Sequence, residues 1–102
     1  MKTAVINDAR KFSLEGIRKN ELLQTDDLDV SLLCFEAGQR DEESVHDSSS
    51  LYQVLEGEAL IHQGGDRERL GKGKVVAVPA GLPHILENAG GGLLVVLAAR
   101  VR

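Results

Sequence analysis

Short apolar segments alternate along the chain with clusters of glycine and polar residues. Each apolar segment is brief, rich in branched or aliphatic side chains and bounded by turn formers, which is typical of β-strands. The predicted strands are 21–25, 29–36, 51–56, 58–63, 67–71, 74–79, 84–89 and 92–101. Their regular spacing favours an all-β sandwich, barrel or jelly roll.

Two local signals add to this picture. A single short helix is predicted over 8–12, with Asn7 as its N-cap. Gly64 and Gly65, followed by Asp66, predict a tight hairpin between two of the strands. Nothing resembles a linker, so residues 1–102 are predicted to form one domain.

Composition narrows the classes of protein. Apolar residues make up 42% of the chain and charged residues 27%, as in soluble globular domains. The longest apolar run, Leu93 to Ala99, is too short to span a bilayer, and no secretion signal is recognised, so we expect a soluble cytoplasmic protein without a membrane partner. The net charge is −4 and the basic residues are scattered, which disfavours nucleic acid as a partner. Cys34 is the only cysteine and lies among apolar neighbours, so we expect a buried thiol.

One segment near the C-terminus carries an informative order of residues. Pro79 ends an apolar strand by removing a backbone donor, Gly81 permits an unusual backbone angle, and His84 begins the next strand. By itself this pattern is also consistent with a histidine that is simply hydrogen-bonded to the backbone near a turn.

The spacing of these residues resembles the cupin family. The second cupin motif is matched at every element, by Gly73, Pro79, Gly81, His84 and Asn88, within 73–88. The first motif falls at 38–57: Gly38 and Gly57 match its ends, and His46 matches its second histidine. The resemblance implies a conical jelly-roll β-barrel, frequently a homodimer, with a small-molecule cavity inside. In the family this cavity usually holds a divalent metal on three histidines and a glutamate.

The chain departs from the family at the metal ligands. Ser44 stands at the first histidine and Ser50 at the glutamate, so only His46 and His84 remain as metal ligands. A neutral hydroxyl is a poor ligand for a first-row divalent ion, and the loss of glutamate removes the negative charge of the set. No cofactor is firmly implied, and a metal-free site and a weakly bound Fe, Mn, Ni or Zn both stay open. Glu42 is the best substitute carboxylate by strand alternation but lies too far along the chain, and His62 is a further candidate imidazole that we expect at the rim.

The expected ligand pocket contains Ser44, His46, Ser50, Tyr52 and His84. Alternation from Ser50 places Tyr52 and Val54 towards the cavity, where the Tyr52 hydroxyl either orients a ligand or reaches the rim. The acidic run 41–43 is expected to be a solvated loop.

Three functions follow as hypotheses. The first is a barrel that binds an unknown small molecule with a weakened or absent metal site. The alternative is a metal-dependent dioxygenase or isomerase that uses His46 and His84, and the third is a structural dimer with a filled interior. A homodimer is expected from the resemblance and because Val30, Leu32 and Cys34 form a second apolar row that needs a cover.

Overall fold

The computed structural model describes residues 1–102 and is almost entirely β. All eight predicted strands are present, within three residues of their predicted ends. They are β1 (Arg18–Gln24), β2 (Leu28–Phe35), β3 (Ser50–Glu56), β4 (Ala59–Gln63), β5 (Asp66–Leu70), β6 (Val75–Val78), β7 (Ile85–Asn88) and β8 (Leu94–Val101). The hairpin prediction is also confirmed, because Gly64 and Gly65 form the two-residue connection between β4 and β5.

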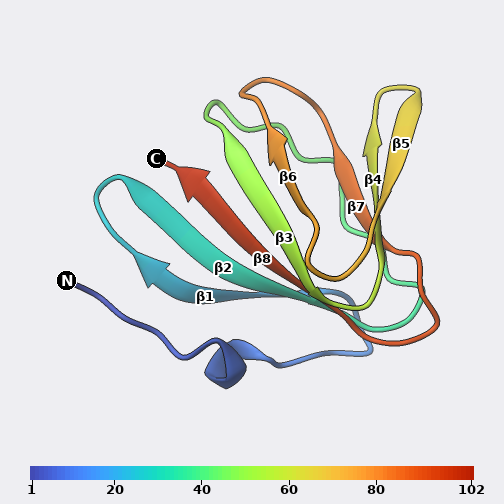
Figure 1. The fold of residues 1–102 in the computed structure, drawn as a ribbon, viewed down its shortest axis with the longest axis horizontal. Coiled ribbons are helices and arrows are strands. Elements are labelled where there is room, and N and C mark those ends of the chain that lie inside the picture. Colours follow the sequence, from blue (N-terminus) through green and yellow to red (C-terminus); the bar gives the residue numbers. More distant parts are fainter.

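The strands form two antiparallel sheets in a jelly-roll arrangement. The larger sheet has the order β1-β2-β8-β3-β6, and the smaller one has the order β5-β4-β7. The two sheets come together at the bottom of the view in Figure 1 and spread apart towards its top. The last strand, β8, lies between β2 and β3, so the centre of the larger sheet is built from segments far apart in the sequence.

The main hydrophobic core lies between the two sheets. It follows the alternation of each strand, so that Val54 on β3, Ile61 on β4 and Val96 on β8 are all essentially inaccessible to solvent. Tyr52 and Val54 both belong to this core, which confirms their predicted direction.

A second cluster packs on the outer face of the larger sheet. Leu32, Cys34 and Val95 are buried there against Ala9 and Phe12 of the N-terminal segment. The N-terminal segment therefore covers part of the apolar row that seemed to need a second sheet or subunit. Cys34 is fully buried, as predicted, and burial raises the pKa of its thiol.

The predicted helix is wrong in type and position. A single 3₁₀ turn, η1 (Ile6–Ala9), replaces it, and no side chain caps its start. The side-chain amide of Asn20 on β1 donates to the carbonyl oxygens of Ala9 and Lys11, at 2.8 and 3.2 Å. Because these carbonyls are bonded to a strand side chain, the backbone beyond Ala9 does not continue as a helix.

The glycines at the motif ends permit tight turns. Gly57 has a φ of 84°, and a Cβ atom at this position would lie 2.2 Å from the carbonyl oxygen of Leu93. Only glycine fits this close approach between the β3–β4 turn and the start of β8. Asn88 acts in the same region, where its side-chain amide donates to the carbonyls of Glu36 and Gly92 at 3.0 and 2.8 Å.

No helix of the structure has the length and apolar character that crossing a bilayer requires.

Candidate functional site

The loop between β2 and β3 is fixed against the start of β7. Ser44 and His84 exchange backbone hydrogen bonds, and the backbone N–H of Gly81 donates to the carbonyl of His46 at 2.7 Å. The sequence suggested regular strand alternation for Glu42, Ser44 and His46, but this segment pairs only at isolated bridges. The two motifs of the sequence are thus joined through the backbone.

Strand register then arranges the inner face of the larger sheet from polar to apolar. Asp29, Arg100 and Ser50 are neighbours across β2, β8 and β3. The next row, two residues away on each strand, consists of Ser31, Ala98 and Tyr52. The row after that, deeper in the barrel, consists of Leu33, Val96 and Val54. One end of the barrel interior is therefore polar, while the rest is hydrophobic core.

His84 is held rigidly behind this polar end. Its side chain is 2% exposed, its Nδ1 lies 2.9 Å from the carbonyl oxygen of Leu82, and its Nε2 lies 2.8 Å from the Tyr52 hydroxyl. A carbonyl can only accept, so Nδ1 of the neutral imidazole carries the proton and Nε2 accepts from Tyr52. Burial raises the pKa of the Tyr52 phenol, a hydrogen-bonding contact with the Ser50 hydroxyl lowers it, and the charges of Asp41 and Arg100 raise and lower it, respectively. Tyr52 is thus a neutral phenol at neutral pH.

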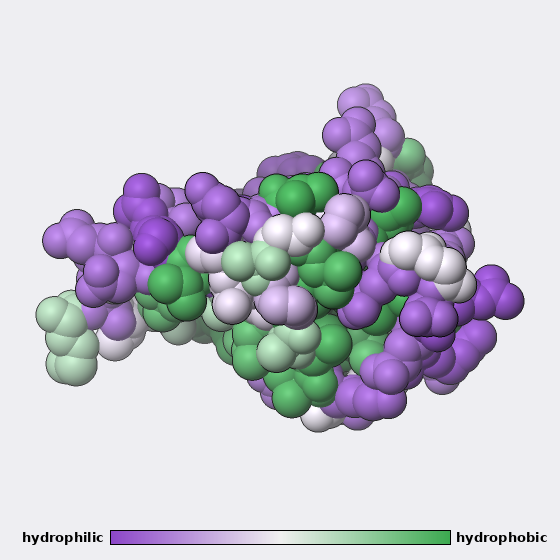
Figure 2. Space-filling model, turned by 90° about the horizontal axis from the view of Figure 1, so that it is seen from above, coloured by the Kyte–Doolittle hydropathy of each residue, from purple (hydrophilic) through white to green (hydrophobic).

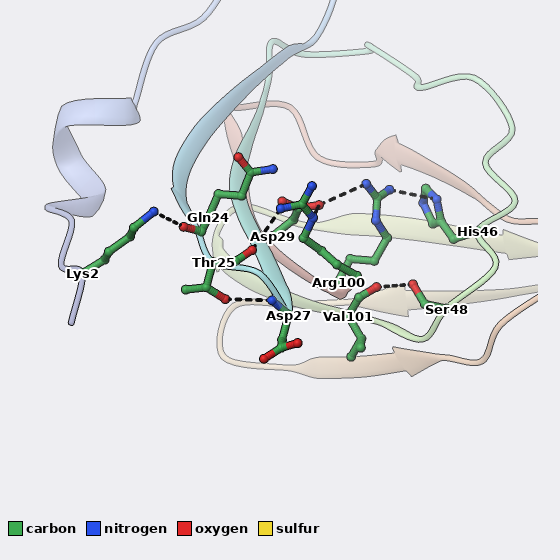
Figure 3. Close-up of polar contacts among 10 residues, drawn as sticks. Lys2, Gln24, Thr25, Asp27, Asp29, His46, Ser48, Arg100 and Val101 are labelled. Atoms are coloured by element: carbon green, nitrogen blue, oxygen red, sulfur yellow. Dashed lines mark hydrogen bonds and ion pairs between the residues drawn. The ribbon is translucent and has the colours of Figure 1, made fainter.

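Arg100 lies between His46 and Asp29, as Figure 3 shows. Its guanidinium Nη1 donates to His46 Nδ1 at 3.0 Å, and Nη2 lies 3.6 Å from Asp29 Oδ2. Arginine has no acceptor, so His46 Nδ1 must be unprotonated and Nε2 carries the proton. Burial, followed by the positive charge of Arg100, holds the pKa of His46 below its ordinary value.

A cavity of about 210 Å³ opens at the polar end of the barrel. This corresponds to the space of about seven water molecules at ~30 Å³ each. Four charged side chains line it: Lys19, Asp29, Asp41 and Arg100. Lys19 Nζ is 3.0 Å from Asp41 Oδ2, so each cation of the lining has a carboxylate partner.

Ser50 lies on the inner wall of the cavity and is 5% exposed. Its Oγ is buried and close enough to the Tyr52 hydroxyl to lower the pKa of that phenol, but it makes no hydrogen bond of ordinary geometry. No other buried side-chain polar atom of the protein is in this state. An unsatisfied buried hydroxyl costs about 1–3 kcal/mol, so such groups are rare outside sites that bind water or a ligand.

The sequence model of a protein family described as 'Cupin domain' matches residues 31–99, which is more than half of the chain. The chain belongs to the cupin family. An uncharacterized protein of Streptomyces coelicolor, SCO3923, is 33% identical over 64 residues, and the match covers 63% of this cupin and 61% of the relative. This cupin therefore spans about six tenths of the length of that curated relative.

Solved structures agree with the cupin fold. TT1209 from Thermus thermophilus superposes with a TM-score of 0.90 at 24% identity, covering 99% of this cupin and 97% of that chain. The cupin superfamily protein DSY2733 from Desulfitobacterium hafniense has a TM-score of 0.80 at 26% identity, with 89% and 82% covered. A double-stranded β-helix protein from Klebsiella pneumoniae has a TM-score of 0.91 at 21% identity, with 99% and 90% covered.

The structure brings the predicted pocket residues of this cupin together. Ser44, His46, Ser50 and Tyr52 line the cavity, while His84 lies behind Tyr52, with its ring centroid 5.7 Å from that of His46. Glu42 is exposed. His62 is on the opposite side of β4 from the core residue Ile61 and bonds Glu87 at 2.8 Å, so it does not join the other two histidines.

Some site residues were missed by sequence reasoning. Asp41 was expected to be a solvated loop residue, but its side chain is only 12% exposed and lines the cavity, because the backbone of Asp41 is bonded to Leu86 on β7. Arg100 could have been found by alternation, since it follows Val96 and Ala98 on one face of β8. Lys19 lay outside the predicted first strand, so no signal was available for it.

The remaining donor set of this cupin does not fit a divalent metal. No three His, Cys, Asp or Glu side chains form a cluster that could hold an ion. His84 Nε2 is already bonded to Tyr52 and His46 Nδ1 to Arg100, whose fixed positive charge would repel a cation. The two histidines thus serve as hydrogen-bonded residues, His46 in the cavity wall and His84 behind Tyr52.

Proposed function

We propose that this cupin binds a small molecule in the cavity at the polar end of the barrel, without a divalent metal. The observation that carries the proposal is Ser50, a residue of the cavity wall whose buried hydroxyl makes no hydrogen bond of ordinary geometry within the protein. A bound molecule would supply the missing hydrogen bond, which would offset the cost of desolvating this group.

The donor set supports the metal-free part of the proposal. In place of the charged glutamate and first histidine of the family pattern, this chain has Ser50 and Ser44, and Arg100 supplies a positive charge beside His46. A metal-dependent enzyme would need both histidines released from Arg100 and Tyr52 before they could act as ligands.

Metal analysis tests this part directly. We expect purified protein to carry far less than one metal per chain, and added Mn, Fe, Ni or Zn to leave the melting temperature unchanged. Stoichiometric metal that is lost in His46→Ala and His84→Ala would overturn the metal-free proposal in favour of the enzyme alternative.

Binding is tested by amide chemical-shift mapping with a panel of small polar metabolites. We expect at least one compound to shift resonances of residues around the cavity. This effect should be lost in Ser50→Val, which replaces the hydroxyl with methyl groups that cannot form a hydrogen bond. Ser49→Val, at the exposed neighbouring position, is the matched control and should bind normally. A panel that includes uncharged, anionic and cationic compounds and yields no cavity shifts would contradict the proposal.

A further inference from the structure

The hydrogen-bond roles around the cavity point to the class of ligand, an inference that rests on the proposed function. The hydroxyl proton of Tyr52 is committed to His84 Nε2, because His84 Nδ1 already donates to the carbonyl of Leu82. Tyr52 is a residue of the cavity wall, and its oxygen can offer a bound molecule only a lone pair, beside the Ser50 hydroxyl that also approaches it. A ligand group next to Tyr52 must therefore be a donor.

His46 has the complementary role. Its Nδ1 accepts from Arg100, which leaves the N–H of Nε2 available as a donor, and no side-chain or backbone group of the protein accepts from it. The rings of His46 and Tyr52 lie 5.7 and 5.5 Å from that of His84, so the acceptor and the donor flank one buried side chain. The Ser50 hydroxyl, which makes no hydrogen bond of ordinary geometry within the protein, adds a group beside Tyr52 that can both donate and accept.

The charges of the lining are balanced. Lys19 and Arg100 each lie beside a carboxylate, Asp41 and Asp29 respectively. The inner wall, formed by Leu33, Ser50, Tyr52 and Ala98, carries no charged group. A carboxylate ligand has no donor to offer Tyr52 and would meet no unpaired cation, whereas its transfer from water into the inner part of the cavity would be costly.

We propose that the ligand is a small uncharged polyol that inserts neighbouring hydroxyl groups between Tyr52, His46 and Ser50. One hydroxyl donates to the Tyr52 oxygen, and the oxygen of its neighbour accepts from His46 Nε2. Only a group that both donates and accepts satisfies all three wall positions at once. The cavity of about 210 Å³ matches a compound of three to six carbons in size.

The test compares compounds that differ only in charge. Glycerol and glycerate form one pair, and erythritol and erythronate form the second. Each is titrated into labelled wild-type protein up to about 50 mM, a range that detects millimolar affinity. We expect the polyols to shift the resonances of residues 46, 50 and 52 and to bind at least about tenfold more tightly than the matching carboxylates.

Variants assign the roles. Tyr52→Phe removes the acceptor oxygen and should weaken polyol binding by at least about fivefold, while Ser49→Ala should leave it unchanged. The spectrum of each variant reports whether it is folded. The comparison of each polyol with its carboxylate uses only the wild-type protein, so it does not depend on either variant.

The outcomes separate this inference from the function on which it rests. Tighter binding of the carboxylates at the same residues would overturn the polyol class but leave small-molecule binding intact. If neither series shifts the cavity resonances while the wider panel yields a binder, the polyol class alone is overturned. Failure of both series and of the panel would overturn both proposals.

Discussion

Arg100 fixes the hydrogen-bonding role of His46 in the cavity. A guanidinium keeps its charge at every accessible pH, and its fork of donors reaches both His46 and Asp29. By donating to His46 Nδ1 it makes the imidazolium form of His46 unfavourable. The same contact fixes the ring of a residue that lies in a loop rather than in a strand.

Removal of Arg100 should change the titration of His46. We expect Arg100→Met to raise the pKa of His46, because the second-largest cause of its lowering is the charge of Arg100 and only burial and weaker charges would remain. NMR titration of the imidazole resonances measures this shift. Arg69→Met, which removes an exposed arginine paired with Glu58, is the control. An unchanged His46 pKa in Arg100→Met would contradict the assigned contact.

The lowered pKa of His46 also predicts how stability depends on pH. The unfolded chain binds a proton at His46 near pH 6.5, whereas the folded protein does so only at lower pH. The contribution of neutral His46 is therefore complete above about pH 6.5 and is lost as the pH falls towards the folded pKa. Urea unfolding between pH 5 and 8 should show this loss, with a shallower slope in His46→Gln. Equal slopes in the two proteins would argue against it.

Ser50 should be a residue at which stability and binding oppose each other. Ser50→Ala removes the buried hydroxyl that has no partner, so we expect the free energy of unfolding to rise by about 1 kcal/mol. Chemical denaturation of the ligand-free protein measures this, with Ser49→Ala as the exposed control. A destabilised Ser50→Ala would indicate that the hydroxyl is satisfied in the folded protein.

The site was only partly predictable, for reasons that differ from residue to residue. His46 and His84 follow from motif spacing, and Tyr52 follows from strand alternation out of Ser50. The pairs Arg100 with Asp29 and Lys19 with Asp41 depend on strand register and loop position, which the sequence does not encode locally. The hydrogen-bond partners of the two histidines, on which the metal-free proposal rests, could be found only in the structure.

At the scale of elements, turns are better determined than the short helix. Glycine clusters and alternating apolar residues mark the strands because both are local signals. The helix predicted over 8–12 does not form because tertiary contacts determine the conformation of that segment. Ala9 packs on the larger sheet, and the side-chain amide of Asn20 donates a hydrogen bond to the carbonyl oxygen of Ala9. Such contacts override weak helix propensity.

The β3–β4 turn offers a sharp test of close packing. We expect Gly57→Ala to destabilise the protein by more than about 3 kcal/mol, because a Cβ would collide with the Leu93 carbonyl and φ is positive. Gly38→Ala is the matched control, since Gly38 also has a positive φ, of 77°, but no atom within 4 Å. It should cost only about 1–2 kcal/mol. Similar losses in urea unfolding of the two variants would show that the backbone angle alone matters.

At the scale of the whole molecule, the homodimer stays a prediction. A row of apolar residues on the outer face of the larger sheet is the candidate contact surface for it. Val30, Ala99, Leu51 and Ala77 are successive cross-strand neighbours on the outer face of the larger sheet, and none belongs to the cluster that packs against Ala9 and Phe12. Leu51 is 40% exposed. Figure 2 views the molecule from above and shows hydrophobic surface in the middle of this view, with mostly hydrophilic side chains around it.

Light scattering coupled to gel filtration tests this surface. If the row forms a dimer contact, wild-type protein should have the mass of two chains at micromolar concentration, and Leu51→Glu should have the mass of one, because a charge cannot be buried there unpaired. Leu14→Glu changes an exposed leucine in the N-terminal segment and should remain dimeric. A monomeric wild-type protein would contradict the prediction.

The position of β8 between β2 and β3 has a consequence for synthesis of the protein on the ribosome. The larger sheet cannot close until residues 94–101 have left the exit tunnel, because these residues pair with both neighbours. Protein synthesis adds about 5–20 residues per second, so β2 and β3 each have an unpaired edge for several seconds before β8 is made. A nascent chain stalled before β8 should therefore be bound by chaperones, whereas release of the last strand should complete folding in one step.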